Sequence, residues 1–174
     1  MLVSGQRVLM GDGSVKMIEN LLPGDTVLDW KGNVQTVEGV MCSKIDPIGR
    51  KFYKYNQKLT MTETHPMYSV DTNFYCMGNP RQFWITSIQY VGQYFQIKRD
   101  YNWGTNIEKI KELTVGTQIA SYENEYETIT SIEEVVPDDG WAYNHKVSGS
   151  GTYVVEGLCV NAWPNERFDY TAWV

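Results

Sequence analysis

The chain has 174 residues, enough for one domain with a substantial core. Hydrophobic residues make up 42% of it and charged residues only 21%, which excludes a wholly disordered protein. A formal net charge of −6 disfavours nucleic acid as a partner, and no apolar run approaches the roughly 18 residues of a membrane span. Because Met1-Leu2-Val3 does not begin a signal peptide, we expect a soluble chain without one.

Short stretches of β-favouring residues, separated by turns rich in Gly, Pro, Asn and Asp, predict an all-β fold. One helical turn is expected within Ser14–Leu22, with Ile18, Leu21 and Leu22 facing inward. Loops are expected at 71–81 and 99–106. The expected strands are residues 6–10, 26–30, 34–41, 50–55, 58–62, 67–71, 82–87, 90–98, 141–147 and 152–160, the last two forming a hairpin around residues 148–151.

Segment 18–40 recurs at 110–132, displaced by 92 positions without a gap. The two copies share hydrophobic, glycine, threonine and aromatic positions. The matching pairs are Ile18 and Ile110, Leu21 and Leu113, Gly24 and Gly116, Val27 and Ile119, Trp30 and Tyr122, Thr36 and Thr128, Val37 and Ile129, and Val40 and Ile132. A repeat of this length predicts two similar β-subunits about a pseudo-twofold axis. The alternative is that two strand-turn-strand units share their alternation by chance.

The stretch Leu59–Val70 carries a Thr-x-x-His pair, Thr62 and His65, followed by Pro66. Pro66 restricts His65 to extended or turn geometry at the end of the preceding strand. A hydroxyl and an imidazole across such a bend can converge on one peptide bond, the hydroxyl orienting it and the imidazole delivering a proton. A plain His-Pro turn is the alternative that these residues alone leave open.

Cysteine and histidine are too few for a disulfide framework or a metal centre. Cys42, Cys76 and Cys159 are an odd number at wide spacings, so reduced thiols in a reducing compartment such as the cytoplasm are expected. His65 and His145, the only histidines, lie 80 residues apart, and a zinc site would need both to meet two cysteines by folding. No metal and no cofactor are therefore predicted.

The last residues, 163–174, form a short tail rich in aromatic side chains: Trp163, Phe168, Tyr170 and Trp173. Aromatic residues dominate contact energy at interfaces. We therefore expect the tail to dock on its own domain or on a protein partner.

Taken together, these segments resemble the Hint domain shared by inteins and the autoprocessing domains of hedgehog proteins. GQRVLMGDGSVKMIENLLPGDTVLDWKGNVQTV resembles the first block of that family, LTMTETHPMYSV its T-x-x-H-P block, and WAYNHKVSGSGTYVVEGLCVNA its closing block. The resemblance covers residues 1–162. It implies a Hint-type horseshoe of two pseudo-twofold related β-subunits, without a homing endonuclease insert.

Family chemistry implies a set of site residues. In the family, a first-position Cys or Ser attacks the preceding carbonyl, the block Thr and His act on the departing nitrogen, and in inteins a final Asn, assisted by a His, cyclises. Thr62 and His65 match this pattern. Met1, however, carries a thioether that cannot become a thiolate. Asn161 stands where the assisting His belongs, and Ala162 has no amide to cyclise.

These substitutions predict a degenerate Hint domain that has lost self-cleavage and is a structural or protein-binding module rather than an enzyme. If Met1 is the natural start, no upstream peptide bond exists to be cut. Thr62 and His65 would then persist as a buried hydrogen-bonded pair. Standalone Hint-like chains also resemble components of phage virions. By analogy, the virion is a second expected location for this chain.

Other readings stay open. An active protein-splicing or autoproteolytic Hint domain would be trapped by introduced substitutions at Met1 and Ala162. A one-residue slip would make Asn161 the cyclising residue, with a cut before Ala162, and Ser4 is a substitute hydroxyl. An unrelated β-barrel binding module would lack two superposable copies.

Overall fold

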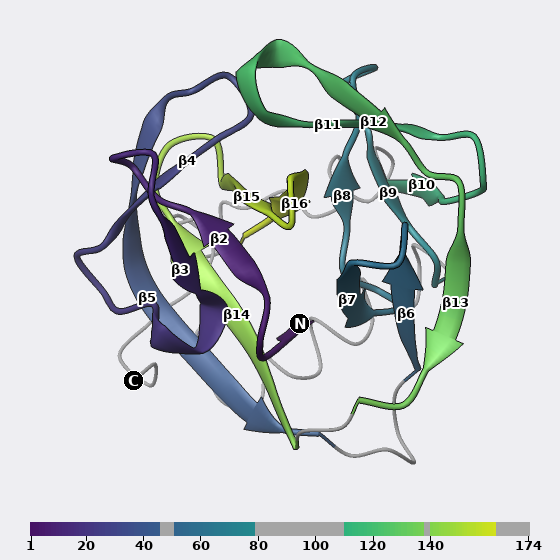
Figure 1. The fold of residues 1–174 in the computed structure, drawn as a ribbon, viewed down its shortest axis with the longest axis horizontal. Helices are drawn as coiled ribbons and strands as arrows, with labels where there is room; N and C mark the ends of the chain where they lie inside the picture. The colour runs from purple at the N-terminus through teal and green to yellow at the C-terminus, as the bar shows by residue number, and fades with distance from the viewer. Residues whose placement is uncertain (46–50, 79–109, 138–139, 163–174) are drawn as a thin grey trace, which may run out of the picture.

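A computed structural model describes residues 1–45, 51–78, 110–137 and 140–162 (Figure 1). The expected strands at 82–87 and 90–98, the loop at 99–106 and the aromatic tail lie outside these ranges. Short β-strands dominate the described residues, joined by tight turns and two 3-10 turns, Ile18–Asn20 and Tyr122–Asn124. None of the described helices is long and apolar enough to cross a membrane.

The described strands form two larger sheets and a separate hairpin. The first sheet contains β1 (Leu2–Val3), β4 (Thr26–Leu28), β5 (Val34–Lys44), β6 (Phe52–Tyr55), β7 (Leu59–Thr62), β13 (Ile132–Val135) and β14 (Trp141–Val147). The second contains β2 (Arg7–Leu9), β3 (Val15–Met17), β8 (Met67–Tyr68), β9 (Phe74–Cys76), β10 (Ile110–Glu112), β15 (Thr152–Val155) and β16 (Leu158–Asn161). The hairpin pairs β11 (Gln118–Ala120) with β12 (Tyr126–Thr128).

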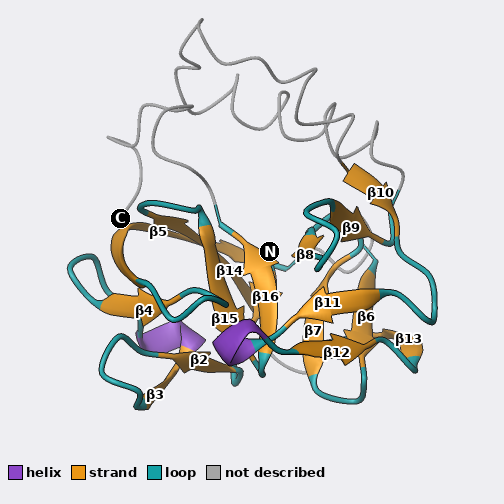
Figure 2. Ribbon diagram, turned by 90° about the horizontal axis from the view of Figure 1, so that it is seen from above, coloured by secondary structure: helices purple, strands orange, loops and turns teal. Residues whose placement is uncertain are grey.

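The strand order of the first sheet is symmetric about its centre. Its order is β13-β6-β7-β1-β14-β5-β4, so β5-β14-β1 mirrors β13-β6-β7, and each neighbouring pair within these six strands is antiparallel. The centre falls between β1 and β7, where Leu2 pairs with Met61. Figure 2 shows β2–β5 on one side of the molecule and β6–β13 on the other, with the amino terminus and β16 between them. The all-β fold with two pseudo-twofold related subunits is therefore confirmed.

The hairpins β4–β5 and β11–β12 belong to the two sequence copies and have the same register. Displacing every pair of the first by 92 positions gives the second: Thr26↔Thr36 and Gln118↔Thr128, Val27↔Gln35 and Ile119↔Glu127, Leu28↔Val34 and Ala120↔Tyr126. Gly24 and Gly116 both have positive φ, 95° and 102°, and donate their N–H to the carbonyls of Val37 and Ile129 at 2.7 and 2.8 Å. Glycine is required there because other residues avoid this backbone region.

Three local predictions are wrong. β14 does not pair with β15: it pairs with β1 and β5, whereas β15 pairs with β16 and β2. The hairpin instead lies within 152–161, around Glu156 and Gly157, whose positive φ values of 49° and 79° suit a two-residue turn. β9 lies inside the predicted loop 71–81, paired with β8 and β10. Leu22 is 62% exposed rather than inward, because the 3-10 turn already ends at Asn20.

One cluster of buried side chains joins the two large sheets. Leu2 and Met61 enter it from the first sheet and Met67 and Val160 from the second, all fully buried. Leu2 matters most for the site because its burial holds β1 between β14 and β7. Truncating a buried leucine of this kind to alanine costs about 2–5 kcal/mol.

Candidate functional site

The end of β7 holds the amino end of β1. Because Leu2 is anchored in the core, Met1 lies beside Thr62, and the Thr62 N–H donates to the Met1 carbonyl at 2.9 Å. The Met1 nitrogen then donates to Thr62 Oγ1 at 2.8 Å. The ladder between the central strands therefore fixes the position of one nitrogen atom.

His65 approaches the same nitrogen from the turn that follows β7. The His65 N–H donates to the Thr62 carbonyl at 3.0 Å, which closes the bend before Pro66. Its Nδ1 lies 2.9 Å from the Met1 nitrogen. The hydroxyl and the imidazole therefore both lie within hydrogen-bond distance of the Met1 amino nitrogen, the atom through which a peptide bond before residue 1 would be made.

The other ring nitrogen of His65 reaches the closing strand. Nε2 lies 2.8 Å from the carbonyl oxygen of Asn161, at the end of β16. A carbonyl only accepts hydrogen bonds, so Nε2 carries the proton and Nδ1 accepts from the Met1 amino group. His65 is thus a neutral imidazole of one defined tautomer, linking both ends of the described domain.

Burial keeps His65 neutral. Its side chain is 7% exposed, and desolvation, followed by the positive charge of the Met1 amino group, holds its pKa well below the ordinary value. The hydrogen bond to Asn161 opposes this lowering, and His145 adds to it slightly. When the Met1 nitrogen is part of a peptide bond, the charge disappears and the pKa of His65 is less depressed.

Solved structures with this arrangement of strands are inteins and an intein-like domain. A bacterial intein-like domain from Clostridium thermocellum is 18% identical with a TM-score of 0.59, covering 93% of this chain and 97% of its own. The gp41-1 intein is 19% identical (TM-score 0.58, coverage 92% and 96%), and a DnaB intein from Synechocystis is 12% identical (TM-score 0.56, coverage 93% and 98%). The chain has the intein, or Hint, fold. No protein-family model and no curated protein sequence matches it.

The intein fold brings the five predicted positions to one place. Met1, Thr62, His65 and Asn161 are joined by the hydrogen bonds above. Ala162 follows Asn161 and donates its N–H to the Gly151 carbonyl at 2.7 Å, with its side chain buried. The site therefore holds a nitrogen and could protonate it only once Nδ1 of His65 has taken up a proton, and it has no thiol or hydroxyl nucleophile on Met1 and no carboxamide on Ala162.

Ser4 stands elsewhere in the intein fold. It lines a separate cavity of about 400 Å³ together with Gly5, Glu19 and Lys54. Ser4 lies in the turn that follows β1, so the backbone there does not place its hydroxyl near the Met1 nitrogen. The structure therefore gives no support to Ser4 as a substitute nucleophile.

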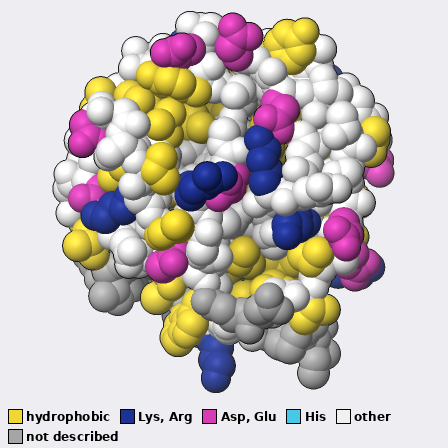
Figure 3. Space-filling model, in the orientation of Figure 1, with side chains coloured by type: hydrophobic (Ala, Val, Ile, Leu, Met, Phe, Trp, Pro, Cys, Tyr) yellow, Lys and Arg dark blue, Asp and Glu magenta, His cyan; other side chains and the backbone are white. Residues whose placement is uncertain are grey.

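His145 is a buried residue that sequence reasoning did not place at the site. It lies in β14, 1% exposed, and burial lowers its pKa to about 3. Its Nδ1 is 3.0 Å from the Tyr153 hydroxyl, and Nε2 has no hydrogen-bond partner among the described residues. Neither histidine is visible on the face shown in Figure 3. The signal in the sequence for its burial was a single histidine in a predicted strand whose side chains alternate between the core and the surface.

The described residues include no group of three or more His, Cys, Asp or Glu side chains arranged to hold a metal ion. The three cysteines are free thiols, with Cys76 and Cys159 buried and Cys42 exposed. Burial raises the pKa of both buried thiols to about 12, so neither is a ready nucleophile at neutral pH.

Proposed function

We propose that this intein-fold chain does not cleave its backbone at Met1 and serves as a structural or protein-binding module. One observation carries the proposal: the Thr62 and His65 pair holds the nitrogen of Met1, a residue whose side chain is a thioether. The half of the site that would receive a departing nitrogen is intact, and the half that would attack is missing.

The chemistry explains why this loss is sufficient. Acyl transfer begins when a sulfur or oxygen bonds to the carbonyl carbon before residue 1, after which the carbon–nitrogen bond breaks and the nitrogen takes up a proton. The sulfur of Met1 already has two carbon substituents and no proton to lose, so it cannot form a neutral thioester. His65 can supply a proton only to a nitrogen that another group has displaced.

The test needs a chain with a peptide bond before Met1. We expect such an extended chain to keep its intact mass for days in the presence of thiol or hydroxylamine, which both cleave thioesters. Loss of the extension at Met1 would refute the proposal. A Met1→Ala chain is the matched control, because it removes the thioether and leaves the hydrogen bonds of the nitrogen in place.

A second candidate is a cut after Asn161, favoured by the 2.8 Å hydrogen bond from His65 Nε2 to the Asn161 carbonyl. This bond would polarise the carbonyl for attack by the Asn161 side-chain nitrogen. A succinimide ring would form, the bond to Ala162 would break, and the Ala162 nitrogen would take the proton. Against it, Asn161 is held in β16 by its N–H to the Pro66 carbonyl at 3.0 Å, and its neighbour is bonded on the other side.

Mass spectrometry separates the two candidates. A cut after Asn161 releases residues 162–174 and leaves a succinimide, 18 mass units below the hydrolysed end by the chemistry of water loss. The Asn161→Ala chain cannot cyclise and is the control. We expect both chains to stay intact; release from the parent alone would establish the second candidate.

We further propose that the partner is a protein bound through the tail residues Trp163, Phe168, Tyr170 and Trp173, and that a virion is one assembly that would contain it. The support is the aromatic density of that segment. Chemical cross-linking within the native assembly tests this. Links from 163–174 to another protein are expected, and links confined to residues 1–162 of the same chain would contradict it.

A further inference from the structure

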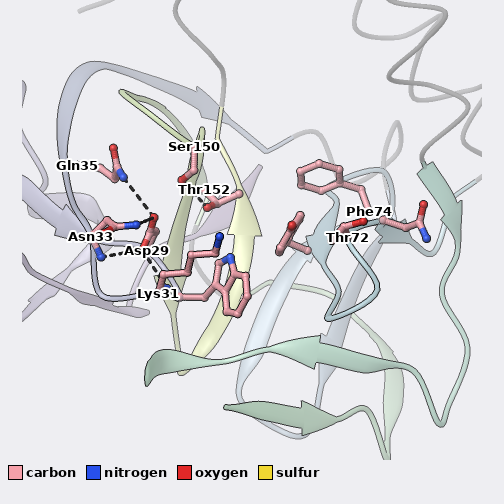
Figure 4. Close-up of a pocket in the computed structure, with 11 residues that line it drawn as sticks. Asp29, Lys31, Asn33, Gln35, Thr72, Phe74, Ser150 and Thr152 are labelled. Carbon is pink, nitrogen blue, oxygen red and sulfur yellow. Dashed lines mark hydrogen bonds between the residues drawn. The ribbon is translucent and has the colours of Figure 1, made fainter. Parts of the chain in front are cut away.

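A cavity of about 540 Å³ opens beside the closing hairpin, and its lining includes none of Met1, Thr62, His65, Asn161 and Ala162. Figure 4 shows its two walls: Asp29, Lys31 and Asn33 with Ser150 and Thr152 on one side, and Thr72 and Phe74 on the other. The first wall comes from the turn between β4 and β5 and the start of β15, the second from the turn between β8 and β9 and the start of β9. Its volume is within the range of small-molecule sites, about 300–1,000 Å³.

The polar groups of the first wall are held in place by a buried carboxylate. Asp29 is 2% exposed and accepts from the N–H groups of Lys31 and Asn33 at 3.0 and 2.8 Å. It also accepts from Asn33 Nδ2 at 3.3 Å and Gln35 Nε2 at 3.2 Å. Because the Asn33 nitrogen is used, the opposite end of its amide is left as an acceptor. The hydroxyls of Ser150 and Thr152, 2.8 Å apart, add groups that both donate and accept.

Aromatic rings line the cavity from both sides. The ring centres of Trp30 and Tyr68 are 5.9 Å apart, and those of Tyr68 and Phe74 are 5.2 Å apart. All three rings line the cavity and are only partly buried. An aromatic face carries partial negative charge and attracts polarised C–H groups. Rings beside neutral amides and hydroxyls suit a ligand that presents C–H groups on one face and hydroxyls at its edge.

Lys31 is the cationic residue of the cavity. Its ammonium group lies 5.3 Å from the centre of the Trp30 ring and forms no ion pair among the described residues. With Asp29 already bonded to four donors, Lys31 is the charge available to a ligand, and it favours a carboxylate. One cation in a chain of net charge −6 is too little for a polyphosphate or nucleic acid.

An extended peptide fits less well. β8 and β15, which contribute Tyr68 and Thr152, are interior strands of the second sheet, each with a neighbour on both sides. They therefore offer no free edge on which a peptide could add as a further strand.

We propose that this cavity binds a short acidic saccharide, such as a uronic acid disaccharide. The sugar ring would pack on Trp30, its hydroxyls would bond to Asn33, Ser150 and Thr152, and its carboxylate would pair with Lys31. The site does not depend on whether the chain cleaves itself, so binding and cleavage are measured separately.

The test is titration of the full chain with digalacturonic acid, followed by calorimetry and by the NMR signal of the Trp30 indole N–H. The methyl ester of the same disaccharide keeps the shape and removes the charge. We expect the acid to bind about two- to fivefold more tightly than the ester, the usual range for an exposed ion pair. Lys31→Met, which keeps the stem over Trp30, should abolish this difference. Lys54→Met, at the other cavity, should leave it unchanged.

Trp30→Ala should weaken both ligands about tenfold, because an aromatic contact is lost. Circular dichroism shows whether the Trp30→Ala chain is folded. If it is not, the comparison of Lys31→Met with Lys54→Met decides the proposal. The proposal is overturned if the Trp30 signal does not move at millimolar disaccharide, or if Lys54→Met acts like Lys31→Met. It is equally overturned if a peptide of residues 163–174 moves the signal and the sugars do not.

Discussion

Replacing Met1 by Cys, in a chain carrying a short peptide before it, should restore cleavage of the bond before residue 1. The new thiol would stand on the residue whose nitrogen already lies 2.8 Å from Thr62 Oγ1 and 2.9 Å from His65 Nδ1. A cysteine thiol can lose its proton and attack the preceding carbonyl, which methionine cannot do. The substitution supplies the one missing reactant at a site that is otherwise assembled.

The geometry of the site predicts how much His65 and Thr62 each contribute to the rate of thioester formation. A positioned acid such as His65 typically contributes about 10²- to 10⁴-fold to the rate. Adding His65→Ala to the Met1→Cys chain should therefore slow thioester formation by that factor. Thr62→Ala removes one hydrogen bond of about 0.5–1.5 kcal/mol, so the rate should fall only about two- to tenfold. Because burial lowers the pKa of His65 and the attacking Cys must lose its proton, the loss of thiolate offsets the gain of protonated imidazole, and the rate should change little as the pH falls from 8 to 7.

The assay follows the intact mass of the extended Met1→Cys chain with and without hydroxylamine. Loss of the extension at the Cys, dependent on His65, is expected. Met1→Ala in the same extended chain gives the background. If the Met1→Cys chain folds and still stays intact, the site lacks more than a nucleophile and the reasoning is wrong. Cleavage that is equally fast without His65 would refute the role given to its Nδ1.

Two further predictions concern stability. Both histidines have pKa values below that of an unfolded histidine, so the unfolded chain binds more protons and stability is lost as the pH falls below about 6.5. Urea titrations between pH 6 and pH 5 should show a slope approaching 1.4 kcal/mol per pH unit from His145, whose pKa is about 3, with a further contribution of the same sign from His65; His145→Gln should remove the first part, and an unchanged slope would contradict the buried neutral state. Gly24→Ala and Gly116→Ala should each cost about 1–2 kcal/mol, because φ is positive while nothing lies within 4 Å of the added Cβ. Gly140→Ala, also in open space but without positive φ, should change the free energy of unfolding by less than about 0.5 kcal/mol, and unequal effects at the two repeat glycines would argue against equivalent turns.

The repeat is the part of the fold that the sequence predicted best. A hairpin is built from local signals: a glycine where φ is positive, and alternation of buried and exposed side chains. Val27 and Ile119 are both fully buried, as are Val37 and Ile129, so the displacement of 92 positions carried the register as well as the pattern.

Pairing between distant strands was harder to predict. The turn at 148–151 looks like a hairpin turn, but it carries the chain from the first sheet to the second. Glu156 and Gly157 make the real hairpin, and Glu is a weak signal for positive φ. β9 was missed for a related reason. Two of its three residues pair with β8, and all three pair in parallel with β10, which is far away in the sequence.

In the candidate site too, residues close together in the sequence were predicted, and contacts between distant segments were missed. Thr62 and His65 were found because both are on one bend. Their target, the Met1 nitrogen, is fixed by the ladder between β1 and β7, which no local pattern reveals. The cavity around Asp29 depends on three segments that are far apart in the sequence, and sequence reasoning missed it entirely.

The position of the site explains how the nucleophile can be absent while the fold is kept. Met1 ends a strand whose stability comes from the next residue, Leu2, which is fully buried, whereas the Met1 side chain is not part of the core cluster. Thr62 and His65 are buried, both side chains are bonded to the Met1 nitrogen, and His65 Nε2 is also bonded to the Asn161 carbonyl. Ala162 is buried, and an apolar side chain there needs no hydrogen bonds. Chemistry at the two reacting positions is therefore dispensable for folding, whereas the pair between them adds stability through its hydrogen bonds.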